Sequence, residues 1–231
     1  MRTLVVGDIH GADKALAQCL ERSAFREGVD RLISLGDVCD GYPDVRACVD
    51  RLMALPNCDF ILGNHDYWTR EWARTGSQPE AWLEQGGDNT VLSYGGGPIP
   101  ESHRLFFENA KTYITLGRKW FVHGGIDPAL PIEGQDEEVL LWDRSLIRTA
   151  YRDHLKQIEQ KAGGYDEIYL GHTPTQYFGF MTPVRFGKVW AMDTGAGWSG
   201  MLTVMDVDTK EYWQSDPTPV LYPGIRPRRQ S

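Results

Sequence analysis

Five short segments of the chain place histidine, aspartate or asparagine side chains beside a glycine. Their polar residues are Asp8 and His10, Asp37, Asn64 and His65, His123, and His172. Imidazole nitrogens with carboxylate and amide oxygens, and no thiolate, suit borderline to hard divalent ions such as manganese, iron, zinc or nickel. Two such ions held close together need a bridging anion, and Asp37, in the second segment, is the candidate. A metal pair can clamp both oxygens of a phosphoryl displacement and lower the pKa of a bound water.

Each segment follows a short run of apolar or β-branched residues, over 4–6, 32–35, 60–62, 120–122 and 167–170. This pattern predicts buried strands that deliver polar side chains to one edge of a sheet. Open α/β sheets bind ligands beyond the carboxyl ends of their strands. An isolated aspartate after a glycine is usually only a turn former. Turn chemistry does not explain why four of the six histidines each follow such a run, so we interpret the set as a metal site.

The segments also resemble a known series of motifs. They read Gly7-Asp8-Ile9-His10-Gly11, Gly36-Asp37-Val38-Cys39-Asp40, Gly63-Asn64-His65-Asp66, His123-Gly124-Gly125 and Gly171-His172-Thr173. This series is similar to the signature of the calcineurin-like metallophosphoesterases, and within them to the phosphoprotein phosphatases of bacterial and phage lambda type. Leu141-Trp142-Asp143-Arg144 and Met192-Asp193-Thr194-Gly195-Ala196 extend the likeness, which runs from about residue 1 to about residue 206.

The resemblance implies a role for each matching residue. The metal ligands are Asp8 and His10 for the first ion, Asp37 for the bridge, and Asn64, His123 and His172 for the second ion. His65 is the general acid that protonates the leaving oxygen. Asp40 matches the acidic residue that orients this histidine, and a carboxylate partner fixes the imidazole tautomer and favours its protonated form. The alternative for Asp40 is a turn or helix-capping role before Tyr42-Pro43.

The chain departs from the resemblance at Gly41. The protein phosphatases usually have an arginine there that grips the phosphate, so a bidentate contact is missing from its usual place. Arg144 keeps its matching position, and we expect Arg144 and Asn64 to contact the substrate. Arg70 and Arg74 could reach inward from a lid, although arginines on a polar helix face are usually only solvated.

The predicted function is therefore that of a dinuclear metal-dependent phosphoesterase, similar to serine/threonine protein phosphatases. A metal-bridging hydroxide attacks phosphorus without a covalent phosphoenzyme. The expected cofactors are two divalent ions, manganese first, with iron, zinc or nickel as alternatives. The expected partner is a phosphoprotein or a small phosphate ester. A symmetrical diadenosine tetraphosphate hydrolase, or another phosphodiesterase, is the alternative, and a catalytically silent scaffold that binds phosphorylated partners is a third hypothesis.

The chain predicts an α/β fold, the four-layer αββα sandwich that the resemblance implies. Helical patterns over 12–22 and 43–54 connect the first three strands, which indicates a parallel half-sheet. We expect a single domain over 1–213, with a helical lid insertion at 67–110 and a proline-rich C-terminal tail at 214–231. The second half returns to strands at 113–115, 119–123, 167–170, 188–192 and 201–207, with a helix over 146–160.

Composition narrows the class of protein. A net charge of −8 over 231 residues argues against a nucleic-acid binder, which needs a basic surface. No apolar run approaches the roughly 20 residues that span a bilayer, so no membrane association is expected. The four cysteines form no C-x-x-C pair and indicate reduced residues of a cytoplasmic protein. The sequence does not indicate the oligomeric state.

Overall fold

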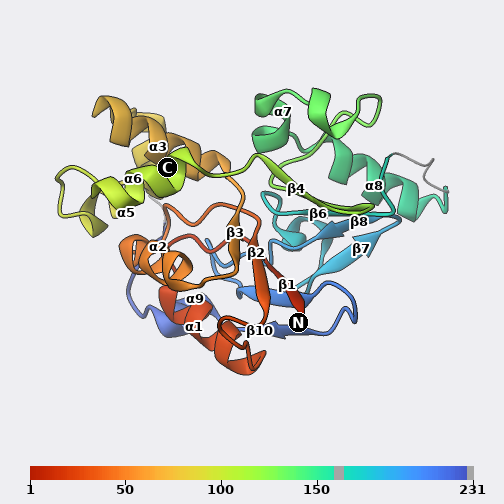
Figure 1. The fold of residues 1–231 in the computed structure, drawn as a ribbon, viewed down its shortest axis with the longest axis horizontal. Helices are drawn as coiled ribbons and strands as arrows, with labels where there is room; N and C mark the ends of the chain where they lie inside the picture. Colours follow the sequence, from red (N-terminus) through yellow and green to blue (C-terminus); the bar gives the residue numbers. More distant parts are fainter. Residues whose placement is uncertain (159–163, 228–231) are drawn as a thin grey trace.

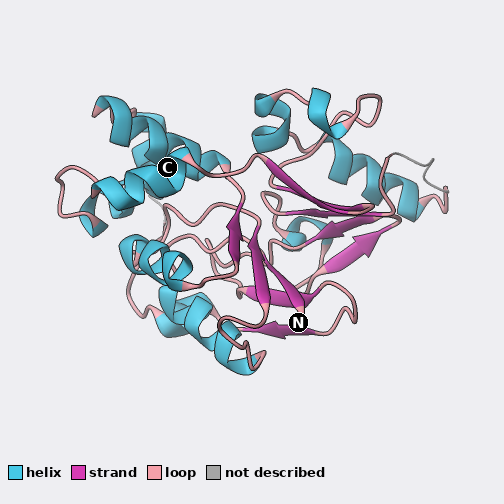
Figure 2. Ribbon diagram, viewed as in Figure 1, coloured by secondary structure: helices cyan, strands magenta, loops and turns pink. Residues whose placement is uncertain are grey.

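The computed structural model describes residues 1–158 and 164–227 and contains two five-stranded sheets. The first sheet has the order β10 (Tyr212–Gln214), β9 (Thr203–Asp206), β1 (Thr3–Val6), β2 (Arg31–Ser34) and β3 (Cys58–Phe60). The second has the order β4 (Tyr113–Leu116), β5 (Lys119–Val122), β6 (Glu167–Leu170), β8 (Val189–Ala191) and β7 (Val184–Phe186). Figure 2 shows the two sheets as neighbouring layers between groups of helices.

The central strands of each sheet are parallel. Val6 of β1 pairs with Ser34 of β2, which pairs with Phe60 of β3. In the second sheet, Val122 of β5 pairs with Leu170 of β6, which pairs with Ala191 of β8. The residues that follow these aligned strand ends are the motif segments. The prediction that strands carry the polar residues to one edge is therefore confirmed.

Three buried apolar clusters lie between the four layers of helices and sheets. Val5, Ile33, Phe121, Tyr169 and Met205 belong to one buried cluster that joins the inner faces of the two sheets. Helices α1 (Asp13–Arg22) and α2 (Val45–Ala54) cover the outer face of the first sheet, and α8 (Ser145–Leu155) covers that of the second. Figure 1 shows this order of helix, sheet, sheet and helix. The predicted αββα architecture is confirmed.

Residues 67–110, which we call the lid segment, contain helices and no strand. The segment includes most of α3 (Asn64–Thr75), then α4 (Glu80–Trp82), a stretch η1 (Leu83–Gly87) that is kinked at Gly86, α5 (Asp88–Ser93) and α6 (Glu101–Glu108). Figure 1 shows these helices grouped beside α2. They share one apolar cluster with α1 and α2, through residues such as Trp72, Trp82 and Phe107. The lid segment therefore packs on the outer face of the first sheet.

Several boundaries differ from those expected. The predicted helix over 146–160 is observed as α8 and ends at Leu155, and its last two predicted residues lie outside the described ones. The pattern did not predict the three-residue strands β7 and β10 or the short helix α7 (Glu137–Trp142). Two 3₁₀ turns (Ile132–Gly134 and Thr175–Phe178) complete the connections.

The segment from 214 onward was expected to be a separate tail. Over 214–227 it lies against the first sheet and α1, with a short helix α9 (Thr218–Leu221). Tyr222 is buried, and its hydroxyl donates to Asp44 Oδ2 at 2.8 Å. Residues 228–231 lie outside the described residues.

The cysteines are free thiols, and Cys19, Cys39 and Cys48 are buried. Among residues 1–158 and 164–227, no helix has the length and apolar character needed to cross a membrane.

Candidate active site

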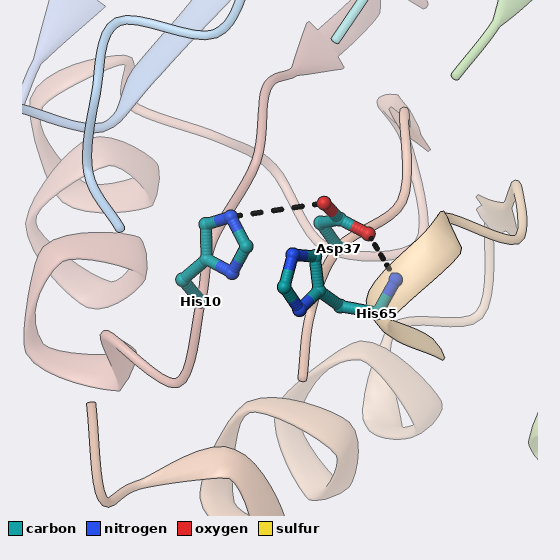
Figure 3. A group of neighbouring side chains, drawn as sticks. All are labelled: His10, Asp37 and His65. Atoms are coloured by element: carbon teal, nitrogen blue, oxygen red, sulfur yellow. Dashed lines mark hydrogen bonds and ion pairs between the residues drawn. The ribbon is translucent and has the colours of Figure 1, made fainter. Parts of the chain in front are cut away.

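Asp37 belongs to both of two groups of buried side chains that could hold a metal ion. His10, Asp37 and His65 form one group, and Asp37, His123 and His172 form the other, each with one ligand atom per residue within 4.8 Å of the rest. Figure 3 shows His10 and His65 converging on the Asp37 carboxylate. Asp37 Oδ2 lies 3.7 Å from His10 Nε2 and 3.4 Å from His123 Nε2. One carboxylate is therefore shared by two potential ion positions.

Backbone carbonyls orient the ligand histidines. His10 Nδ1 lies 3.0 Å from the carbonyl oxygen of Cys39, and His123 Nδ1 lies 2.8 Å from that of Leu35. A ring nitrogen that donates to a carbonyl leaves the other nitrogen for a metal. His172 has the opposite arrangement, because its Nε2 donates to the Trp142 carbonyl at 3.2 Å and leaves Nδ1.

Asp8 carries the clearest sign that a cation belongs in this site. Its Oδ2 accepts a hydrogen bond from the backbone N–H of His172 at 2.8 Å, whereas its buried Oδ1 has no hydrogen-bond partner. Gly171 leaves that oxygen room, because a Cβ at this position would lie 2.2 Å from it. A buried carboxylate oxygen without a donor is costly. A divalent ion would satisfy it, so the donor set fits the metals that the motifs imply.

The charges of the site balance around Asp37. Burial opposes its ionisation, but His123, His65 and His10 outweigh burial and hold the pKa of Asp37 well below its usual range. Burial also opposes protonation of His123, yet the negative charge of Asp37 raises the pKa of His123 to about 9. His123 Nε2 lies 2.9 Å from Asn64 Oδ1, so both ring nitrogens face acceptors. A proton on His123 Nε2 therefore occupies the position in which a metal ion would contact Asn64, His123 and Asp37.

Two further pKa shifts suit metal binding. Burial, followed by the negative charge of Asp193, raises the pKa of Asp8 well above its usual range. Burial, reinforced by the charges of His123 and Arg144, lowers the pKa of His172 to about 2. His172 is therefore neutral, the form of imidazole that binds metals, and a cation would stabilise the ionised form of Asp8.

The predicted acid pair is in contact. His65 Nδ1 lies 2.6 Å from Asp40 Oδ2, and both side chains are buried. His65 Nδ1 thus faces Asp40, while the His65 ring also belongs to the group with His10 and Asp37. This geometry supports the predicted orienting role of Asp40, whose backbone φ of 67° is unusual for an aspartate.

Sequence reasoning missed two partners of Asp40. Trp82 Nε1 lies 3.0 and 2.9 Å from its two carboxylate oxygens, and Thr90 Oγ1 donates to Oδ1 at 2.6 Å. Both partners come from the lid segment. The tryptophans of this segment were interpreted as packing residues, and no local motif marks a contact across 42 or 50 positions.

The predicted arginines differ in their surroundings. Arg144 is exposed at the start of α8, and none of its side-chain atoms forms a hydrogen bond or ion pair with the described residues. It lies near enough for its charge to lower the pKa of His172. Arg70 instead pairs with Glu137 at 3.0 Å, and Arg74 pairs with Glu71 at 3.0 Å. Arg144 is therefore the arginine that best matches a phosphate contact.

Backbone from two distant segments covers Gly41. Asn89 Nδ2 donates to the Gly41 carbonyl at 2.5 Å and to that of Arg226 at 3.4 Å. A Cβ on Gly86 would lie 2.5 Å from the Gly41 nitrogen and 2.6 Å from the Pro227 carbonyl oxygen. Gly41 itself has φ of +80°, and a Cβ there would lie 3.0 Å from His10. The lid segment thus contacts the Gly41 backbone, and an arginine side chain at this position would begin against His10.

Comparisons with known proteins show the family of the chain. The family model described as calcineurin-like phosphoesterase matches residues 1–195. Serine/threonine-protein phosphatase 2 of Escherichia coli is 39% identical over 215 residues, which cover 86% of this chain and 89% of that protein. The symmetrical bis(5'-nucleosyl)-tetraphosphatase of Dechloromonas aromatica is 30% identical over 129 residues, 55% of this chain and 45% of that protein.

A solved structure shares the fold. The protein serine/threonine phosphatase from Saccharomyces cerevisiae aligns with a TM-score of 0.62 at 17% identity, over 98% of this chain and 82% of that one.

Proposed function

The chain belongs to the calcineurin-like phosphoesterase family, and on this basis we propose that it is a serine/threonine protein phosphatase that works with two divalent metal ions. It is a metal-dependent phosphoric ester hydrolase by family. The substrate class, the number of ions and their identity are our inference. We predict that the ions are manganese, which metal analysis would test. We also predict that the enzyme works in the cytoplasm, which cell fractionation would test.

The position of Asp37 supports this proposal more than any other observation. Its carboxylate belongs to both groups of candidate ligand atoms, the first with His10 and His65 and the second with His123 and His172. Asp8 belongs to neither group, and its unpartnered Oδ1 is what supports it as a ligand. Asp8 and His10 would hold the first ion with Asp37, and Asn64, His123 and His172 would hold the second. Bound there, such ions supply Lewis-acid stabilisation of the phosphoryl oxygens and activate the attacking water.

The chain's own groups perform the remaining steps. Arg144 is free to form charge-assisted hydrogen bonds with phosphoryl oxygens. As water adds to phosphorus and the bond to the leaving oxygen breaks, His65 transfers its Nε2 proton to that oxygen. Asp40 accepts from His65 Nδ1–H and so stabilises the doubly protonated ring, whose second proton, on Nε2, is the one donated. No nucleophilic serine or cysteine is required, since water provides the new oxygen.

A symmetrical diadenosine tetraphosphate hydrolase is the second candidate. The similarity to the Dechloromonas aromatica enzyme favours it, as does the Asn64-His65-Asp66 triplet. The absence of an arginine at Gly41 weakens the case for both classes. A catalytically silent scaffold has less support, because every predicted ligand and the acid histidine are present.

The test is substrate preference after metal removal and reloading with manganese. We would compare p-nitrophenyl phosphate, bis-p-nitrophenyl phosphate, a phosphothreonine peptide and diadenosine tetraphosphate. Preference for the peptide supports the protein phosphatase. Preference for the dinucleotide or diester supports the second candidate. No hydrolysis of any of the four substrates would support the catalytically silent scaffold.

A further inference from the structure

The Asp40 carboxylate is held from three sides inside the protein. His65 Nδ1 lies 2.6 Å from Oδ2, Thr90 Oγ1 donates to Oδ1 at 2.6 Å, and Trp82 Nε1 lies within 3.0 Å of both oxygens. Asp40, Thr90 and Trp82 are each 0% exposed. Water therefore cannot take the place of a missing donor without rearrangement.

Thr90 fixes both the backbone and the side chain of Asp40. Its hydroxyl accepts from the Asp40 backbone N–H at 2.8 Å and donates its one proton to Oδ1. Asp40 has a positive φ, which few aspartates adopt without supporting contacts. A single hydroxyl therefore ties the unusual backbone to one carboxylate rotamer.

The lid segment has a specific local structure where it delivers Trp82. A kink at Gly86, whose φ is +103°, separates Trp82 from the helix that carries Thr90. Gly87 makes room for the indole, because a Cβ at this position would lie 2.6 Å from Trp82 Nε1. The kink brings two donors that are eight positions apart onto the same carboxylate.

We propose that Trp82 and Thr90 are positioning residues for the acid step, which fix the Asp40 carboxylate and so aim the His65 ring at the leaving oxygen. This inference rests on the proposed function, since it needs His65 to act as the acid. It makes the lid segment part of the catalytic apparatus and not only a cover. A purely structural role is the competing explanation, because any buried carboxylate needs donors.

The two explanations predict losses of activity on different substrates. An aimed acid matters for an ester with a poor leaving group and hardly matters for one whose leaving group departs without a proton. General damage to the fold or the metal site would slow both substrates. The test therefore compares phenyl phosphate with 2,4-dinitrophenyl phosphate at one pH, with manganese-loaded enzyme.

Thr90→Val is the main variant, because it keeps the side-chain shape and removes the hydroxyl. We expect kcat for phenyl phosphate to fall about 10-fold or more, a fraction of the whole general-acid effect, and kcat for the dinitrophenyl ester to change less than about 2-fold. Thr90→Ser should restore the lost activity. Ser93→Ala is the matched control: it removes a hydrogen bond from Arg46 N to the same helix without touching Asp40, and we expect no selective loss.

Melting curves and bound metal would be measured for each variant. If Thr90→Val does not fold, Trp82→Phe provides the same comparison, because it keeps an aromatic ring and removes the Nε1 donor together with part of the indole. Equal losses on both esters, or no loss on either, would overturn the positioning role. A wild-type protein inactive on both esters would instead refute the proposed function, and the positioning role with it.

Discussion

His10 and Asp37 are joined through both backbone and side chain. The His10 backbone N–H donates to the Asp37 carbonyl at 2.8 Å, and His10 Nε2 lies 3.7 Å from Asp37 Oδ2. Both residues have positive φ, 51° and 48°, a conformation that costs non-glycine residues about 1–3 kcal/mol each. Asp40 and His172 share this feature. Backbone conformation and hydrogen bonding therefore hold the loops that carry His10 and Asp37 in position.

The shared position of Asp37 predicts how metal content responds to its loss. Asp37→Asn removes the negative charge between the two ligand groups, and neighbouring cations then repel each other without compensation. We expect bound manganese to fall from two ions per chain to one or none after equilibration and gel filtration, measured by elemental analysis. Phosphatase activity should fall at least about 100-fold, as expected when a catalytic metal is lost.

The control for this experiment is Asp208→Asn. Asp208 is an exposed carboxylate next to Val207, whose N–H binds Thr3 at the start of β1, away from the carboxyl ends of the strands. Its replacement should leave metal content unchanged. Two tightly bound ions in Asp37→Asn would contradict the bridging role.

His65 is expected to act on the leaving group and not on metal binding. His65→Ala should lower kcat for phenyl phosphate about 100-fold, within the usual range for general acid catalysis, and affect 2,4-dinitrophenyl phosphate much less. Bound manganese should match the wild-type protein. Full activity of the variant on phenyl phosphate would show that another group donates the proton.

Arg144 is expected to bind phosphoryl oxygens. Arg144→Ala should raise KM and lower kcat/KM about 10-fold to 100-fold, because hydrogen bonds to charged groups are worth roughly 1.5–3 kcal/mol. Arg148, one turn further along α8 and also exposed, provides the control, since Arg148→Ala should leave both constants near wild type. Equal effects of the two variants would point to general electrostatic attraction.

The sequence contained enough information to predict the metal groups but not the lid contacts. Each predicted ligand lies one to four residues after the end of a strand, so Asp8, Asp37 and His123 could be placed at one edge from local patterns alone. Trp82 and Thr90 are 42 and 50 positions away from Asp40 in the sequence. Their segment has no alternating strand pattern that would indicate which side chains face the site. The contacts near Gly41 involve residues 226 and 227, which are even further away in the sequence. Such contacts follow from tertiary packing and not from spacing.

The last prediction concerns stability and a carboxylate outside the site. Asp30 is 0% exposed and accepts hydrogen bonds from Arg26 and Arg2, including 2.8 Å from Arg26 Nη2 and 2.7 Å from Arg2 Nη2. These arginines, Arg26 first, hold the pKa of Asp30 well below its usual range although burial opposes this. Because the folded value lies below the unfolded value of about 3.9, the stabilisation is complete above that pH and is lost as pH falls.

Asp30→Asn should therefore lower the free energy of unfolding by about 2 kcal/mol at pH 7, less than for a fully buried ion pair because both arginines are partly exposed. The difference from wild type should shrink steadily as pH falls below about 4. Urea unfolding of both proteins from pH 7 to pH 3 measures it, with Asp208→Asn as an exposed control that should change stability by less than about 1 kcal/mol. A deficit that stays constant down to pH 3 would mean that lost packing, and not the charge of Asp30, accounts for the effect.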